Sequence, residues 1–444
     1  MRPDSGRPVA ILGAGLAGVT AAAALRQRGI PVRLYEAGPR MAGLAASFKD
    51  ADGFSSDFGA HFITNRLAAA VGVASHCRDV AYYGESVLLR GSVYSYPFGL
   101  VRNPRFVLSG IAARTARHSG PPASVAEYFR RAYGVSLAED VAIPLVEAWS
   151  GASADTLAPS VASEKLQNGV ARSVGLKLAS RVSGRAVANG YSHEMPENRF
   201  VWHVYPEGGV GTLVERLAAG LDDAIQLESP VEAIVVEAGR VVAVRVRGRE
   251  EEVSAAISTT PCNVLPRLVN GSDKLRQLER FRFRPMIFVN LRLRGRGLLP
   301  DTVLWTPERQ FPFFRLTDTT KSMPWLAPPG KSLVTVDLGC QTQYPLWTMG
   351  EDALADLCLE HLTSIIRDVR KLFLGARVLR TPIAYPVFLN EYEEARRQLA
   401  HSTGIAGLYS VGRNGEFAHV LMEDVYWRTL AKVREIVRDL PAAA

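Results

Sequence analysis

A glycine turn near the amino terminus restricts the fold of this chain more than any other feature of its sequence. The apolar run Val9–Leu12 is typical of a buried strand and leads directly into the sequence GAGLAG at positions 13–18. An alanine-rich helix follows to about Arg28, and Val32–Tyr35 is typical of a second strand. A strand, a turn, a helix and a second strand within about thirty residues predict the start of a parallel sheet.

The glycines of this turn have the GxGxxG spacing of a dinucleotide-binding loop. Gly13 allows the tight turn, Gly15 lets a pyrophosphate approach the backbone, and Gly18 lets the helix pack closely on the strand. The helix begins at Leu16 and Ala17, where free N–H groups and the positive end of the helix dipole favour phosphates. The turn predicts a bound dinucleotide, with a tight turn that holds no ligand as the alternative.

Glu36 ends the second strand and favours the dinucleotide over an empty turn. A carboxylate at this place accepts hydrogen bonds from ribose hydroxyls and disfavours a 2′-phosphate. Strand, helix and acid are all in the order that the binding mechanism requires.

Length and composition limit the remaining possibilities. A chain of 444 residues with 47% hydrophobic content predicts two domains, each with a sizeable core. The four cysteines are far apart and form no CxxC pair, which predicts no metal site or disulfide framework and favours a reducing cytoplasm. The first residues lack the apolar segment of a signal peptide, and no apolar run is long enough for a membrane span.

The net charge of +8 predicts attraction for anionic small molecules. The arginines are scattered and no recognition motif accompanies them, so we expect no nucleic-acid partner. One segment, Arg102–Arg117, mixes arginines with Phe106, Val107, Leu108 and Ile111. Such a segment can lie on a membrane surface, but a solvated helix packed on its own domain is the favoured interpretation.

Periodicity and apolar runs predict further elements along the chain. Strands are expected at 92–97, 225–227, 231–236, 241–246, 256–260, 287–293 and 333–338, and helices at 125–133, 141–149, 212–221, 352–373 and 421–440.

The residues after Glu36 resemble a motif of FAD proteins of the glutathione-reductase-like class. EAGPRMAG at 36–43 resembles their ExxxRxGG run, with alanine at position 42 in place of the first glycine. The resemblance implies that Ala37 and Arg40 lie at the cofactor and that the backbone of Gly43, Leu44 and Ala45 runs along the flavin.

A second run, DFGAH at 57–61, resembles the DxGxH run of the same proteins. The resemblance places Gly59, Ala60 and His61 beside the isoalloxazine ring. A hydrogen-bonded structural histidine is the alternative for His61.

Two later motifs extend the resemblance to the FAD-dependent superfamily that includes protoporphyrinogen oxidase, monoamine oxidase, carotenoid desaturase and UDP-galactopyranose mutase. YPEGGVGTL at 205–213 resembles a glycine-rich run of the oxidase-like members, and GRNGEFAHVLMEDV at 412–425 resembles the carboxyl-terminal GRxxxYxYxxMDxV motif. No covalent attachment motif is recognisable, so non-covalent FAD is expected. The contacts that the resemblance implies in these parts are Val231 at the adenine, Gly412 and Arg413 at the pyrophosphate and ribityl chain, and Leu421, Met422 and Val425 at the start of the last helix.

The resemblance implies an α/β fold with two parts. A discontinuous Rossmann-type FAD-binding domain with a parallel sheet would comprise residues 1–75, 200–265 and 396–444. A mixed α+β substrate-binding domain would comprise residues 76–199 and 266–395.

Three functions remain open from the sequence. The first is an oxidoreductase that passes hydride from a small metabolite to flavin N5, with His61 as a candidate catalytic residue. The second is a non-redox nucleotide-sugar mutase, because FFRLT at 313–317 resembles the mutase run whose arginine, here Arg315, contacts a diphosphate. Trp149 lies in a run that also resembles the mutases, but their central run is absent. The third is a flavoprotein without catalysis. Neither the substrate nor the oligomeric state follows from the sequence.

Overall fold

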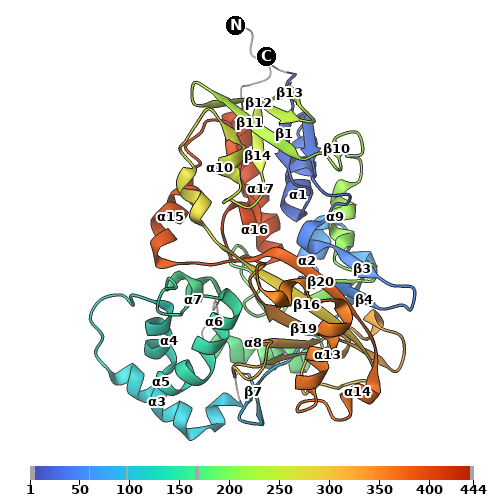
Figure 1. The fold of residues 1–444 in the computed structure, drawn as a ribbon, viewed down its shortest axis with the longest axis vertical. Coiled ribbons are helices and arrows are strands. Elements are labelled where there is room, and N and C mark those ends of the chain that lie inside the picture. Colours follow the sequence, from blue (N-terminus) through green and yellow to red (C-terminus); the bar gives the residue numbers. More distant parts are fainter. Residues whose placement is uncertain (1–5, 60, 97–98, 166–169, 441–444) are drawn as a thin grey trace.

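The computed structural model describes residues 6–59, 61–96, 99–165 and 170–440, and its strands form two large sheets joined by helices (Figure 1). The smaller of the two sheets lies in the upper part of the view and the larger one in the lower part. The candidate site is built from elements of both.

The upper sheet has five parallel strands in the order β10-β2-β1-β14-β21. Its central strand, Val9–Leu12, is short, apolar and completely buried, as is usual for parallel sheets, which are covered on both faces. The α/β fold class with a parallel Rossmann-like sheet is confirmed, whereas the domain boundaries stay a prediction. The strands are β1 (Val9–Leu12), β2 (Val32–Tyr35), β10 (Ile225–Gln226), β14 (Ala255–Ser258) and β21 (Leu408–Ser410).

Helices and a small, mostly antiparallel sheet complete the upper part. Helix α1 (Leu16–Arg26) packs against both α9 (Gly211–Ala218) and α17 (Met422–Asp439). The predicted hairpin at 231–246 is present, and its turn residues Ala238 and Gly239 have φ of 48° and 77°, as in a tight strand-to-strand turn. This second sheet consists of β11 (Val231–Glu237), β12 (Arg240–Val246), β13 (Arg249–Glu252) and β15 (Val269–Asn270).

The lower sheet has seven strands in the order β20-β16-β19-β18-β17-β7-β8. Its strands are mostly antiparallel, and the predicted strands at 287–293 and 333–338 are antiparallel neighbours within it. The apolar side of α13 (Glu351–Leu362) covers one face of this sheet. The strands are β7 (Glu85–Leu89), β8 (Ser92–Ser95), β16 (Phe283–Arg294), β17 (Val303–Trp305), β18 (Arg315–Asp318), β19 (Lys331–Gly339) and β20 (Phe373–Pro386).

The helix predicted at 352–373 is wrong in its second half. Helix α13 ends at Leu362, a short helix α14 covers Val369–Leu372, and β20 begins at Phe373. Asp368 has φ of 55°, a left-handed backbone conformation that breaks the helix. The apolar spacing continues through this break because Ile366 and Val369 are buried in the same core as α13.

A layer of helices lies beside the lower sheet. Two of the predicted helices are confirmed, as α4 and as the π-helical turn Ala138–Ala142 followed by α6. Helix α3, in the arginine-rich segment, packs on α4 and α5, and its Phe106 is buried whereas Leu108 and Ile111 are exposed. Strand 92–97 is confirmed as β8, although position 97 lies outside the described residues. The helices are α3 (Pro104–Thr115), α4 (Val125–Tyr133), α5 (Val135–Leu137), α6 (Ile143–Ser150), α7 (Ser160–Lys165) and α8 (Val170–Ser183).

Shorter elements connect these layers. They are β3 (Ser47–Lys49), β4 (Ser55–Asp57), β5 (Ile63–Thr64), α2 (Asn65–Val71), β6 (Cys77–Asp79), β9 (His203–Pro206), α10 (Leu265–Leu268), α11 (Thr319–Ser322), α12 (Pro345–Thr348), α15 (Glu393–His401) and α16 (Gly412–Gly415).

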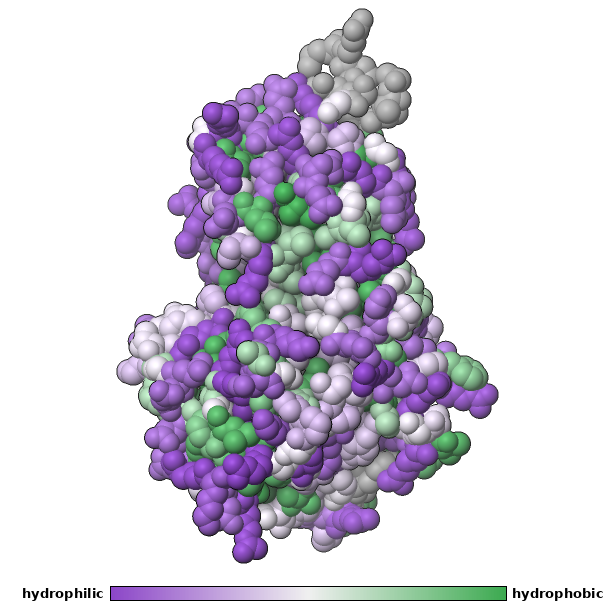
Figure 2. Space-filling view, turned by 90° about the vertical axis from the view of Figure 1, so that its right-hand side faces the viewer, coloured by the Kyte–Doolittle hydropathy of each residue, from purple (hydrophilic) through white to green (hydrophobic). Residues whose placement is uncertain are grey.

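The molecule narrows between the two parts when it is seen from its side (Figure 2). Polar side chains cover most of this side, with apolar residues in small separate groups. Within the described part of the chain, no helix has the length and apolar character that a membrane crossing requires.

Candidate flavin and substrate site

The three glycines of the turn have three different surroundings. A Cβ at Gly18 would lie 1.9 Å from the carbonyl oxygen of Gly13, and a Cβ at Gly13 would lie 2.5 Å from Thr259 Oγ1. Both positions are therefore limited to glycine by packing. A Cβ at Gly15 would meet nothing within 4 Å, so close approach of a ligand explains this glycine better than packing does.

The start of α1 offers an anion site beside Gly15. Gly15 is the N-cap residue, and no side chain caps this end of the helix. Unsatisfied N–H groups of a first turn bind phosphates readily. This end of α1, where Leu16 and Ala17 lie, has the donors that a pyrophosphate requires.

The carboxylate of Glu36 joins the turn to the end of β2. Its Oε2 accepts a hydrogen bond of 2.8 Å from the N–H of Ala14, and its Oε1 accepts one of 2.8 Å from the N–H of Gly38. Residues 228–231 run beside it, because the N–H of Ser229 donates to the Glu36 carbonyl oxygen at 2.8 Å. Val231, at the start of β11, is therefore brought close to the predicted ribose position.

The segment after Glu36 returns to the glycine turn. The N–H of Ala42 donates to the carbonyl oxygen of Ala14 at 2.9 Å, and a Cβ at Gly43 would lie 3.6 Å from the Cα of Gly15. The short turn at 43–45 thus lies beside the open glycine. Ala37 and Arg40 are exposed, and the guanidinium of Arg40 lies over the ring of Phe48, 4.8 Å from its centre.

The carboxyl-terminal motif meets the same turn from the other side. Gly412 has φ of 83°, and a Cβ there would lie 2.6 Å from the Cβ of Ala17. Leu421 is the N-cap residue of α17, Met422 is its first residue, and Val425 is buried. The carboxyl-terminal motif and the amino-terminal glycine turn are therefore in contact at the start of α1.

Two acidic side chains in the first turn of α17 are fully buried, and their carboxylates accept hydrogen bonds from other parts of the protein. Glu423 accepts hydrogen bonds from Thr64 Oγ1 at 2.9 Å and from Arg66 Nε at 2.6 Å. Asp424 accepts hydrogen bonds from Ser192 Oγ at 2.5 Å and from the N–H of His193 at 2.9 Å. These contacts attach α17 to the segments at 64–66 and 192–194.

His61 follows Asp57 in a buried polar network. Asp57 accepts hydrogen bonds from Ser47 Oγ at 2.6 Å and from the hydroxyl of Tyr205 at 2.7 Å. Burial raises the pKa of Asp57 to about 6, although these two hydrogen bonds oppose the shift. His61 Nδ1 lies 3.9 Å from Asp57 Oδ2 and has no hydrogen-bond partner in the described structure. Gly59 precedes His61, and Ala60 lies outside the described residues.

His61 is an uncharged imidazole at neutral pH. Burial, followed by the positive charges of Arg413 and Arg315, lowers its pKa to about 4. Two guanidinium groups from distant parts of the chain therefore lie near enough to His61 to affect its charge.

Arg315 is held by a carboxylate on the neighbouring strand. Its Nε donates to Asp337 Oδ2 at 2.8 Å, and its guanidinium lies 5.5 Å from the centre of the Trp305 ring. Burial alone would lower the pKa of Arg315, but the Asp337 carboxylate raises it overall. A Cβ at Gly59 would lie 3.3 Å from Arg315 Nη2, so the loop before His61 touches this arginine.

Arg413 has aromatic neighbours and no carboxylate partner among the described residues. Its guanidinium lies 4.8 Å from the centre of the Tyr385 ring, and its Nη2 lies 3.5 Å from His419 Nδ1. Burial, with a further contribution from Arg315, lowers its pKa. Trp149 packs against Tyr385 and His419 with ring centres 4.9 and 5.1 Å apart.

Sequence reasoning missed two residues of this site. Tyr385 lies on β20, a strand that was not expected, and Asp337 was expected only as part of a strand. The sequence signal available for Tyr385 was the apolar content of ARVLRTPIAYPV at 376–387, which does not alternate regularly with polar residues. The site as a whole has two guanidiniums, the carboxylates of Asp337 and Asp57, and an uncharged imidazole. Arg413 is the guanidinium without a carboxylate partner among the described residues, and it favours an anionic ligand group.

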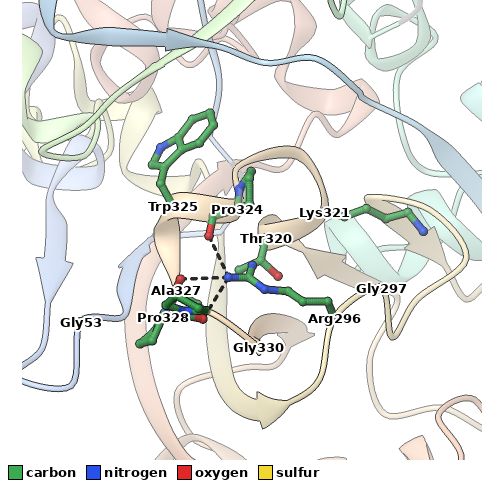
Figure 3. Close-up of a pocket in the computed structure, with 11 residues that line it drawn as sticks. Gly53, Arg296, Gly297, Thr320, Lys321, Pro324, Trp325, Ala327, Pro328 and Gly330 are labelled. Atoms are coloured by element: carbon green, nitrogen blue, oxygen red, sulfur yellow. Dashed lines mark hydrogen bonds between the residues drawn. The ribbon is translucent and has the colours of Figure 1, made fainter.

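An open cavity of about 880 Å³ lies apart from this site (Figure 3). Arg296 projects into it and donates hydrogen bonds of 2.9 to 3.0 Å to the carbonyl oxygens of Pro324, Ala327 and Pro328. These bonds hold the proline-rich turn in place, and none of the predicted site residues lines the cavity.

The fold and the site define a dinucleotide-binding protein of α/β type, and comparison with known families agrees. Residues 11–71 match the model of an NAD(P)-binding Rossmann-like domain. Residues 109–427 match the model of the flavin containing amine oxidoreductases, and the chain belongs to this family. Family membership implies a flavin cofactor, and the open Gly15 and the uncapped start of α1 fit such a group.

Solved structures show the same fold at low sequence identity. A reduced UDP-galactopyranose mutase is 17% identical with a TM-score of 0.81, over 98% of this chain and 97% of that chain. A putative protoporphyrinogen oxidase from Exiguobacterium is 18% identical with a TM-score of 0.74, over 97% and 98%. Cyclohexylamine oxidase from Brevibacterium oxydans is 14% identical with a TM-score of 0.72, over 98% and 99%. The superfamily resemblance drawn from the motifs is confirmed.

Proposed function

We propose that the protein is an FAD-dependent oxidoreductase that oxidises an anionic small metabolite. The observation that carries the proposal is the meeting of Arg315 and Arg413 at an uncharged His61. The buried guanidinium of Arg413, which has no carboxylate partner among the described residues, favours a carboxylate or phosphate group on the substrate.

The cofactor in this proposal is FAD, bound without a covalent link. The glycine turn and the start of α1 would hold its pyrophosphate, and Glu36 would accept hydrogen bonds from its ribose. The segment 43–45, Gly412 and the start of α17 would enclose the rest. Bound flavin supplies a ring that accepts and returns hydride, so the chain itself needs no metal or nucleophile.

The protein residues would position the substrate and keep water out. Arg315 and Arg413 would bind the anionic group by charge-assisted hydrogen bonds. In this proposal Arg413 therefore faces the substrate as well as the ribityl chain to which the motif resemblance assigns it. Trp149 and Tyr385 would form an apolar wall that orients the reacting carbon. His61 carries no charge at neutral pH, so it would neither repel the arginines nor compete with them for the anion.

The experiment is a visible spectrum of the purified protein, followed by acid precipitation. A flavin band whose chromophore stays in the supernatant as FAD supports the proposal. Anaerobic bleaching by candidate hydroxy or amino acids, and recovery of the band in air, would then identify oxidation. A protein that shows no flavin band and takes up no FAD contradicts it.

A nucleotide-sugar mutase is the second candidate, and the position of Arg315 favours it. This arginine is fixed by Asp337 beside His61, as a residue that binds a diphosphate would have to be. Such an enzyme is active only with reduced flavin and consumes no net electrons. Conversion of a UDP-sugar that occurs only after dithionite has reduced the flavin would support this candidate. If the Arg315→Ala variant converts the sugar as fast as the wild type does, Arg315 does not bind the diphosphate.

A further inference from the structure

Exposed apolar side chains are concentrated in one part of the molecule. Twelve large apolar side chains are exposed in the described structure, and only Phe200, Tyr344 and Leu374 lie outside residues 82–182. The other nine are Tyr82, Val93, Tyr96, Val107, Leu108, Ile111, Val135, Leu178 and Val182. Scattered single residues need no explanation, but a concentration of this kind marks an interaction surface.

The same part of the chain carries an unusual charge. The stretches 86–126 and 170–193 contain nine of the 52 lysines and arginines and none of the 44 acidic residues. The remaining residues therefore hold 43 basic and 44 acidic side chains. The positive net charge of the whole protein originates in these two stretches.

Contacts connect the elements that carry these residues. Lys177 of α8 lies 5.1 Å from the centre of the Tyr96 ring, which follows β8. Arg90, in the turn between β7 and β8, and Arg105 of α3 both pair with Asp140. Helix α3 packs on α5, and α3, α5 and β7 all lie at the lower end of the molecule (Figure 1). We call the exposed side chains of α3, α5, β8 and α8 the basic apolar face.

The helices of this face present apolar residues next to arginines. On α3, Leu108 and Ile111 lie three residues apart, and Arg114 follows at the same spacing. On α8, Leu178 and Val182 lie four residues apart on one side. Arg102, Arg114, Arg117 and Arg181 are exposed, and no carboxylate of the described residues pairs with them.

We propose that the basic apolar face binds the surface of a membrane that contains anionic lipids. Leu108 and Ile111 would enter the boundary between headgroups and acyl chains, and the unpaired arginines would bind lipid phosphates. The charge complementarity selects this partner, because guanidinium groups match phosphate geometry and the face has few acids to meet a basic protein.

Flotation with lipid vesicles tests the proposal. The full-length protein is mixed with vesicles of phosphatidylcholine alone, or with about 25% phosphatidylglycerol, at low salt and at about 0.5 M NaCl. We expect flotation with the anionic vesicles, weakened by salt, and little flotation with the neutral ones. Equal binding to both vesicle types, or none to either, overturns the proposal.

Matched variants distinguish binding through the basic apolar face from nonspecific binding to vesicles. Leu108→Glu should abolish flotation, whereas Phe200→Glu should not, since the two side chains are 67% and 65% exposed. Arg114→Glu combined with Arg117→Glu should lower the partition coefficient by about 30-fold or more, at about 1 kcal/mol for each arginine lost. Arg367→Glu, at a side chain that is 97% exposed elsewhere, is the charge control.

Two further measurements test whether the variants are folded and whether the face binds a second copy of the protein. Thermal unfolding of each variant, followed by circular dichroism, verifies that the protein is folded. Sedimentation of the wild type identifies the other possible occupant. A dimer that Leu108→Glu dissociates, together with no vesicle binding, would assign the face to contact between two copies and overturn the membrane proposal.

Discussion

The upper parallel sheet and the lower seven-stranded sheet differ in how far apart in the chain their key contacts lie. The glycine turn depends on contacts such as that of Gly18 with Gly13, five positions away. The candidate substrate site depends on pairs such as Arg315 with Asp337 and Arg413 with Tyr385, which come from separate strands and loops. The backbone requirements of the upper part can therefore be predicted from the sequence. The site in the lower part depends instead on side-chain charges that only folding brings together.

The largest effect is expected from breaking the charge pair of the lower sheet. Asp337→Ala leaves the guanidinium of Arg315 buried without its counter-charge, which should cost about 3 to 5 kcal/mol of unfolding free energy. Urea denaturation measures this change.

The double variant Arg315→Met, Asp337→Leu is the control. Removing both charges should restore most of the lost stability, because the desolvation cost disappears with them. If the double variant is as unstable as Asp337→Ala, packing rather than charge holds this pair.

The second effect is the contribution of His61 to the pH dependence of the free energy of unfolding. Its pKa of about 4 in the folded protein lies below the value near 6.5 of an unfolded chain. Between these values the unfolded chain binds more protons, so stability rises with pH, by up to about 3 kcal/mol from this residue. His61→Gln should flatten this rise.

The control for this experiment is the exposed His401. His401→Gln should leave the pH profile of urea denaturation between pH 4 and 7 as it is in the wild type. An unchanged profile in His61→Gln would show that the imidazole is not held in its uncharged form.

The third comparison separates two glycines within the upper turn. Gly18→Ala should cost about 3 kcal/mol of stability, because its Cβ would overlap the Gly13 carbonyl oxygen. Gly15→Ala should cost less than about 1 kcal/mol in the protein without cofactor, yet weaken FAD binding by about tenfold or more, since the methyl group occupies the ligand side. Denaturation and FAD titration measure the two effects. Equal loss of stability in both variants would contradict the assignment of Gly15 to a ligand.

The smallest effect is expected at Ala42, which stands where the related motif has glycine. Its φ of 82° is strained for alanine, so Ala42→Gly should be neutral or stabilise the protein by about 0.5 kcal/mol. The same change at Ala24, inside α1, should destabilise by about 1 kcal/mol. A loss at Ala42 as large as at Ala24 would indicate that the backbone strain is absent.

Predictions from the sequence were most accurate where local patterns determine the backbone. Strands β1 and β2 and helix α4 begin and end at the predicted residues, and the hairpin at 231–246 is present. The helix predicted at 352–373 failed because apolar periodicity continued across a left-handed residue, Asp368. Periodicity reports which side chains are buried, and two elements that bury side chains in one core can produce a single pattern.

The sequence by itself determined the parallel sheet, the dinucleotide turn and the resemblance to a flavin family. Each depends on glycine positions or apolar runs, whose physical effect acts over a few residues. Only the tertiary structure placed Gly412 on Ala17, set Arg315 against Asp337 and brought Arg413, Tyr385, Trp149 and His419 together. Charge and burial of a side chain depend on every element packed around it, so the uncharged state of His61 and the anionic character of its ligand emerge only when those elements come together.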